Sequence, residues 1–510
     1  MEKLAVHGKI LVLGAVSLVL GVAFTILFYE QEPGLNFSIF AVLVVCSGLF
    51  LAYLFSRHIE REHYALMLCA LFFSSMVFVR SSELLTFFNA LGSLLLLLIV
   101  VGTFAGKHIK AYIPLDYIKA PFLPLRFIGP FFETFGEMLS LRRISGDRSV
   151  TKEIIRGSLM ALVAIAVFAW LFASADIVFE KIFSSIVTFE LDQEMVDRLI
   201  LGLIATAFFI GAFGFMYRKI HPSLLSSPPE KPRNLGVIET MILLGSINVL
   251  FLIFILLQLA SLFGGESHLL AAGLTYAEYA RKGFFELVLV AVLSYLIISF
   301  AEKQIIKKEN SHLRSFKILS GILVLQVILI LISAFTRLSL YEEAYGFTDI
   351  RLYSHALMVW IAVVLVLLSH HIWTNGERAL FAFRTFCTVV LLLFAMNMLD
   401  PDVFIAKKNL ERYAATGQID ARYLGGLSED ALPYTIHLLD DPKQETRSDF
   451  ATGLFYHYDG WDGPANQMGD HAWQSLRLSR ANAQELLVQR KSAVKASMLL
   501  NSGAENSSEE

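Results

Sequence analysis

Long apolar segments follow one another from Ile10 to Leu399. About 20 apolar residues in a helix are enough to cross the roughly 30 Å hydrocarbon layer of a bilayer. Only helices and closed barrels satisfy their backbone polar groups there, and the alternating pattern of barrel strands is absent. We therefore predict an all-α, polytopic transmembrane helical bundle of about eleven spans. The predicted spans are 10–29, 35–55, 64–80, 84–105, 154–174, 199–217, 237–262, 276–301, 317–336, 352–373 and 384–399.

The composition agrees with a membrane protein and excludes several other classes. Charged residues make up 17% of the chain, whereas soluble domains carry about 25%. A net charge of -3 does not indicate a nucleic-acid partner, so the expected partner is the lipid bilayer. Cys46, Cys69 and Cys387 all lie inside apolar runs, which favours neither a disulfide framework nor a thiolate metal site. No cofactor is indicated.

Two short motifs do not support a metal or nucleotide site. His58 and His63 are five residues apart, whereas a helical zinc pair needs a spacing of four. Gly102 and Gly106, followed by Lys107, lack the spacing of a phosphate-binding loop. Close helix packing is the better interpretation of the two glycines. The sequence therefore predicts no metal site.

The basic residues predict how the chain is oriented. Lys and Arg concentrate in connections on the cytoplasmic side of a membrane. Arg281 and Arg351 are exceptions to the alternation, which otherwise places the N-terminus in the cytoplasm and the C-terminus outside it. The predicted cytoplasmic connections contain Arg57, Arg61, the basic residues of 107–152, 218–233 and 303–317, and Arg378.

The chain divides into five predicted regions. An N-terminal four-helix membrane segment precedes a basic, proline-containing loop on the cytoplasmic membrane surface. A core membrane domain of about seven helices follows. Asp400 and Pro401 end the last span, and a helical extracytoplasmic tail precedes a polar, disordered end. The predicted limits are 1–105, 106–153, 154–399, 400–500 and 501–510. Helices are expected in the tail at 402–416, 428–439, 443–457 and 472–499.

One cluster of charges is predicted near the outer membrane boundary. Thr275 and Glu278 form a capping-box pattern, so Glu278, Lys282 and Glu286 would share one helix face beside Arg281. A second capping pattern begins at Ser339. A charge inside the hydrocarbon needs a partner or a water-filled recess. The charges either pair and fix helix register, or line a recess for a headgroup, sugar or small ion. The candidate ligand-binding residues are Asp176, Glu278, Arg281, Lys282, Glu286, Arg337, Glu342, Glu343 and Arg351.

Four segments carry a family resemblance. They are LFASADIVF at 171–179, LTYAEYARKGFFEL at 274–287, YEEAYGFTDIRLY at 341–353 and DPDVFIA at 400–406. Together they resemble a bacterial membrane family catalogued as domain of unknown function 4173, with a related 4153 group, over roughly residues 150 to 440. The resemblance implies a multi-pass protein of the bacterial cytoplasmic membrane and supplies no activity. Asp400 stands where that family usually has asparagine.

Three functional interpretations follow. The first is a non-catalytic accessory or sensor protein of the bacterial envelope, whose tail contacts an envelope protein partner. The second is a binding or transport protein with an outer-facing polar recess. The third is a membrane enzyme acting on a lipid-linked substrate, with Glu278 or Glu286 as general base. The charges lie off the bilayer midplane and the sequence shows no internal repeat, which weakens transport. An enzyme would need a second perturbed carboxylate or a metal site, which the spacing does not identify, so the first interpretation is favoured.

Overall fold

The computed structural model describes residues 2–104, 106, 108–139, 172, 176, 179, 193–217, 236–263, 284–304, 310–457 and 472–506. Every regular element within these ranges is helical, which confirms the predicted all-α class. Nine of the described helices are long and apolar enough to cross a membrane. They cover Gly8–Phe28, Leu35–Leu54, Arg61–Val79, Glu83–Phe104, Gln193–Tyr217, Ile238–Gln258, Leu313–Tyr345, Asp349–Thr374 and Arg378–Leu399.

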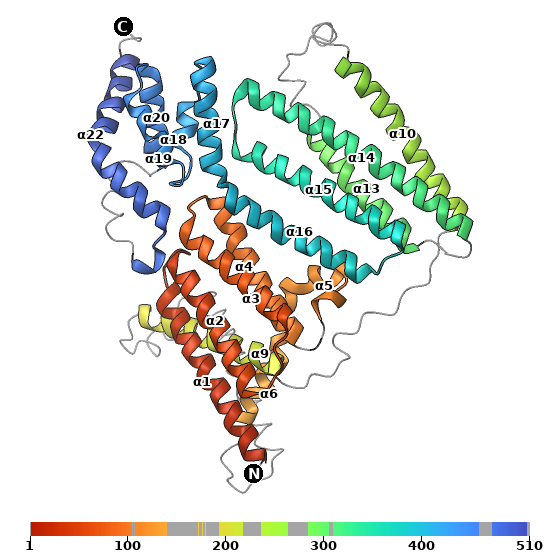
Figure 1. Ribbon diagram of the computed structural model, residues 1–510. Coiled ribbons are helices and arrows are strands. Elements are labelled where there is room, and N and C mark those ends of the chain that lie inside the picture. Colours follow the sequence, from red (N-terminus) through yellow and green to blue (C-terminus); the bar gives the residue numbers. More distant parts are fainter. Residues whose placement is uncertain are drawn as a thin grey trace.

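The N-terminal helices form one group (Figure 1). Its members are α1 (Glu2–Phe28), α2 (Leu35–Leu54), α3 (Arg61–Val79), α4 (Glu83–Phe104), η1 (Ile109–Ala111), α5 (Pro114–Lys119), η2 (Ala120–Phe127), α6 (Ile128–Leu139) and α9 (Gln193–Tyr217). Helices α1 and α9 cross closely because glycines face each other there. A Cβ atom on Gly21 would lie 2.6 Å from the carbonyl oxygen of Gly202. Small residues at such crossings are typical of membrane helices.

A second group of helices lies beside the first (Figure 1). It contains α10 (Val237–Phe263), α13 (Phe284–Gln304), α14 (Asn310–Tyr345) and α15 (Asp349–Thr374). Polar side chains join α10 to α14: the Asn248 side chain donates to the Leu319 carbonyl at 3.1 Å, and Gln326 donates to the Asn248 carbonyl at 3.1 Å. Helix α16 (Arg378–Leu399) contacts α15 in this group and α4 in the first, so it connects the two.

The tail, which we define as the described residues from Asp400 to Asn506, packs at the end of α16 (Figure 1). Its buried core includes Ile405, Leu424, Phe450 and Leu487. Arg422 on α18 (Ala421–Gly425) and Gly453 on α20 (Gln444–His457) lie where these two helices approach closely. A Cβ atom on Gly453 would lie 2.2 Å from the Arg422 carbonyl oxygen. The tail helices are α17 (Pro401–Thr416), α18 (Ala421–Gly425), α19 (Leu432–Thr435), η4 (Ile436–Asp440), α20 (Gln444–His457), η5 (Trp473–Ser475) and α22 (Leu478–Asn506).

Several local predictions need correction. Ser339 does not cap a helix, because α14 runs through it and its hydroxyl donates to the Phe335 carbonyl at 3.1 Å. Between Ile109 and Leu139 the chain forms short helices that pack on α1, α4 and α9, and the predicted place of this region on the cytoplasmic membrane surface stays a prediction. The tail has an unpredicted helix, α18, and α22 continues to Asn506, past the predicted limit of disorder. The predicted span 154–174 lies almost wholly outside the described residues.

Candidate functional site

Three connections between helices meet where the spans join the tail. They are the turn from α3 to α4, the turn from α14 to α15, and the step from α16 to α17. At that step Asp400 adopts the left-handed conformation with φ 55°, and Pro401 begins α17. Proline suits the first helical position because its missing N–H would have no partner there. We call Arg80, Asp349, Asp400, Asp402 and Asp430 the junction.

Arg80 ties the end of the last span to the tail. Its guanidinium pairs with the Asp400 carboxylate and donates to the Asn397 carbonyl oxygen at 2.7 Å. The same guanidinium lies 4.0 Å from the Asp430 carboxylate. The Asp430 side chain is only 3% exposed. A charge removed from water this completely needs such a partner, so Arg80 neutralises a site made by three chain segments.

Asp430 also caps the first turn of α4. Its Oδ2 atom accepts hydrogen bonds from the backbone N–H groups of Ser81 at 2.8 Å and Ser82 at 3.2 Å. The Ser479 hydroxyl donates to its other oxygen. A carboxylate is favourable at a helix N-terminus, where unpaired N–H groups and the helix dipole carry positive charge. One tail side chain therefore holds a span of the N-terminal group.

A second pair of carboxyl groups lies beside this ion pair. Asp402 is 3% exposed, and its Oδ2 atom accepts from the Ser428 backbone N–H at 3.3 Å. Its carboxyl group neighbours that of Asp349 on α15, which packs against α17. The Asp349 backbone N–H donates to the Tyr423 hydroxyl at 3.1 Å. Two ionised carboxylates have no proton to donate, so the two carboxyl groups can hydrogen-bond to each other only when the pair holds a proton.

Asp400 and Asp402 therefore retain protons at a pH where exposed aspartates have lost them. Burial raises the pKa of Asp402, and the neighbouring Asp349 carboxylate raises it further. Burial also raises the pKa of Asp400 to about 6; Asp430 adds to this rise, and Arg80 opposes it. Desolvation and a like charge both favour the neutral form of a carboxyl group. The site can bind and release protons near neutral pH.

Two asparagines join the same helices deeper among the spans. The side chains of Asn89 and Asn397 donate to each other, at 2.8 and 2.7 Å, and both are fully buried. This reciprocal pair satisfies two amide groups between α4 and α16. It fixes the position of α16, and with it the position of Asp400.

The predicted outer charge cluster is only partly brought together. Glu342 is buried in α14, and its Oε2 atom lies 3.5 Å from His355 Nδ1. Arg351 lies with its guanidinium 4.2 Å from the centre of the Tyr341 ring, and it donates to the Gly346 carbonyl. Arg337 is also buried. None of these contacts joins two of the predicted residues, so the choice between charge pairing and a ligand recess stays a prediction.

The other predicted residues do not join them within the described part of the chain. Asp176, Glu286 and Glu343 are exposed. Asp176 accepts a local hydrogen bond from the Phe179 backbone N–H at 2.8 Å. The remaining three, Glu278, Arg281 and Lys282, lie outside the described residues.

Two cavities lie among the spans, away from these charges. A cavity of about 350 Å³ lies between the two groups of helices, where Phe73, Trp360 and Phe386 contribute to its wall. Another of about 470 Å³ lies within the N-terminal group, beside Phe40 and Phe209. Both walls are almost wholly apolar, and none of the predicted recess residues contributes to either.

Sequence reasoning missed most of the junction. Asp349 and Asp402 lie within two of the segments that carry the family resemblance, and neither Arg80 nor Asp430 is among the predicted site residues. A signal was nevertheless present. Arg80 stands in a very short connection between two spans. A charge at the edge of the hydrocarbon is costly unless it reaches water or a partner, so its position points to a partner.

One known family matches most of the chain. A sequence model described as "Domain of unknown function (DUF4153)" matches residues 67–438. The chain belongs to this family. The DUF4153 match begins far before the roughly 150 expected from the sequence, and it includes all five junction residues. No curated protein and no solved structure matches the chain. It is an integral membrane protein of a family without an established function.

Proposed function

We propose that this protein is a non-catalytic accessory or sensor protein of a bacterial envelope, in which the junction makes the position of the tail depend on protonation. The observation that carries the proposal is the burial of the Asp402 carboxyl group in the tail, beside Asp349 at the start of a span, where α17 packs against α15. The basic residues of the connections favour an extracytoplasmic tail, available to an envelope protein partner. The relation to family 4173 stays a prediction.

The direction of the pH effect follows from the raised pKa values. A carboxyl group whose pKa is higher in the folded protein stabilises the fold most when the pH is low enough to protonate it. That contribution is lost as the pH rises, for Asp400 between about 4 and about 6, and for Asp402 in the same direction. Ionisation of the Asp349–Asp402 pair then places two negative charges together, which favours separation of α15 from α17.

The test is hydrogen exchange of the full-length protein in nanodiscs at several pH values, corrected for the intrinsic pH dependence of exchange. We expect the protection of the backbone amides of α17 and α18 to fall about tenfold or more as the pH rises from 5 to 8. A tenfold change corresponds to a difference of one pKa unit between the closed and the open state. The variant Asp402→Asn cannot ionise at this position, so it should lose clearly less protection than the unmodified protein and keep only the part of the pH response that comes from Asp400.

The matched control is Asp440→Asn. Asp440 lies in the same tail, is 55% exposed and pairs with Arg490 at 3.0 Å on the surface. This variant should keep the pH response of the unmodified protein. Equal pH responses in the unmodified protein and in Asp402→Asn would contradict the proposal, as would loss of the response in the Asp440 control.

A binding or transport function is the second candidate. It is favoured by Glu342, which is 3% exposed near the α14–α15 turn and faces His355 at 3.5 Å. A buried ionisable residue within a span often belongs to a substrate or ion pathway. Solute uptake that falls in Glu342→Gln while the amount of protein stays constant would favour this candidate over the sensor.

A further inference from the structure

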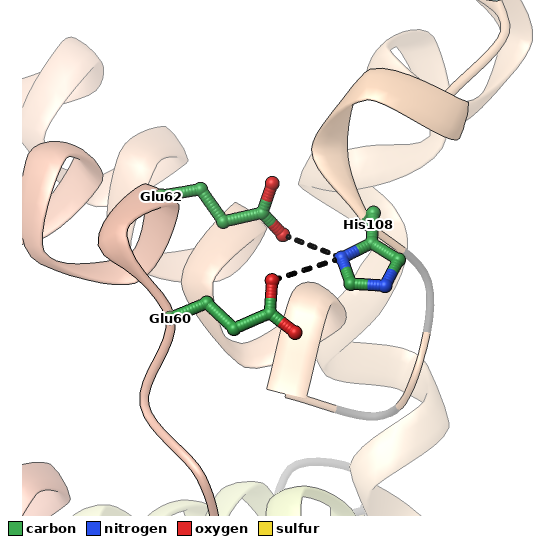
Figure 2. Close-up of side chains that lie close together, drawn as sticks. All are labelled: Glu60, Glu62 and His108. Carbon is green, nitrogen blue, oxygen red and sulfur yellow. Dashed lines mark hydrogen bonds and ion pairs between the residues drawn. The ribbon is translucent and has the colours of Figure 1, made fainter.

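A different set of side chains converges where α3 begins and α4 ends, at the ends of these helices that lie away from the junction. Glu60 and Glu62 stand at the start of α3, and His108 follows α4 at the start of η1. The His108 Nδ1 atom lies 3.1 Å from Glu60 Oε2 and 3.3 Å from Glu62 Oε1. Figure 2 shows both carboxylates directed at this one nitrogen. Two separate segments therefore place two oxygens and one nitrogen around one point.

The backbone that carries these side chains is held by buried neighbours. The Glu60 backbone N–H donates to His63 Nδ1 at 3.1 Å, and the His63 ring packs on Phe104 at the end of α4, with ring centres 4.1 Å apart. On the other segment, Ile109 is 2% exposed and anchors η1 in the N-terminal core. Ligands held by such neighbours are preorganised for a metal ion.

A hydrogen bond from His108 can serve only one of the two carboxylates, whereas a cation can bind all three groups. An Nδ1–H group carries a single proton, so it cannot make a linear hydrogen bond to both carboxylates at once. A divalent ion can instead accept the nitrogen lone pair and one oxygen from each carboxylate. The three ligand atoms lie within 4.8 Å of one another, which is close enough to share one ion. The His108 side chain is 63% exposed, so an ion can reach the site from water.

We propose that Glu60, Glu62 and His108 bind a divalent transition-metal ion and thereby clamp the α2–α3 connection to the segment that follows α4. One imidazole and two carboxylates suit Zn²⁺, Mn²⁺, Fe²⁺, Co²⁺ or Ni²⁺, and they leave coordination positions for water. Among the described residues, this is the group of histidine, cysteine and acidic side chains whose geometry permits a shared ion. His63 is not a ligand through Nδ1, because that atom accepts the Glu60 amide.

The test uses Co²⁺ and Zn²⁺ with full-length protein that carries no polyhistidine tag and has been treated with a chelator. We expect saturable binding of one Co²⁺ ion per chain, with visible absorption bands from an ordered ligand field, and displacement by Zn²⁺. The variants His108→Ala and Glu62→Gln should each weaken binding at least about tenfold. Glu62→Gln preserves the shape of the side chain, so it tests the ligand even if the histidine variant folds poorly.

The matched control is His58→Ala, which removes an exposed histidine from the same connection. It should leave Co²⁺ affinity and spectrum unchanged. The proposal is overturned if the unmodified protein shows no saturable binding, if the double variant His108→Ala, Glu62→Gln binds as tightly, or if His58→Ala weakens binding as much as His108→Ala.

Discussion

Replacing Arg80 with alanine is expected to detach the tail from the spans. Arg80 pairs with Asp400 and lies 4.0 Å from Asp430, and both carboxylates are largely buried. Removing one partner of a buried ion pair costs about 3–5 kcal/mol, because the other charge stays buried without compensation. Hydrogen exchange in nanodiscs at pH 8 should show protection of α17 and α18 falling by at least about 100-fold.

The pH dependence of this variant separates lost charge pairing from lost packing. Without Arg80, the pKa of Asp400 should rise further, so this group can take up a proton as the pH falls. The defect of Arg80→Ala should therefore shrink at pH 5. The matched control Arg490→Ala removes a surface partner of Asp440, with side chains 43% and 55% exposed, and should cost less than about 1 kcal/mol. Equal effects of the two variants, or a defect of Arg80→Ala independent of pH, would contradict the role given to Arg80.

The second large effect is expected from Phe450→Ala in α20. Phe450 is fully buried in the core of the tail. Truncating a buried phenylalanine to alanine costs about 3–5 kcal/mol, since packing contacts are lost and a cavity remains. The amides of α20 should lose at least about 100-fold of their protection. Because Asp402 lies on α17, which borders the same core, the pH response of the junction should weaken as well.

Tyr456→Ala is the control for this variant. Tyr456 lies on the same helix, is 65% exposed, and should contribute little to the core. The amides of α2 and α3 should keep their protection in both variants, because the tail core and the N-terminal core are separate clusters. A loss of protection that is as large in α3 as in α20 would show that the tail does not open by itself.

The sequence predicted the spans well where the end of a helix coincides with the end of its apolar run. The predicted span 35–55 corresponds to Leu35–Leu54, and 84–105 corresponds to Glu83–Phe104. The prediction 317–336 was too short, because α14 extends from Asn310 to Tyr345. Hydropathy detects only the part of a helix that fits the hydrocarbon, whereas the backbone hydrogen bonds continue into polar residues at both ends.

The functional residues were much less predictable. The outer cluster was inferred from local spacing, which identifies residues on one face of one helix. The junction instead joins Arg80 from the α3–α4 turn to Asp400 and Asp430. The role of a lone arginine or aspartate depends on the partner it meets, and no local sequence period reveals that partner. The same reason explains the two missed carboxylates, Glu60 and Glu62, which depend on His108 beyond the next span.

The sequence alone determined that this chain is helical and enters a membrane many times. Each apolar segment satisfies its own backbone within one helix, so its structure in lipid does not depend on distant neighbours. The tertiary structure decided which charges are buried and which of them meet. Asp402 lies beside Asp349 only because α17 packs against α15. Burial and distance set the energy of such a pair, and both are properties of helix packing.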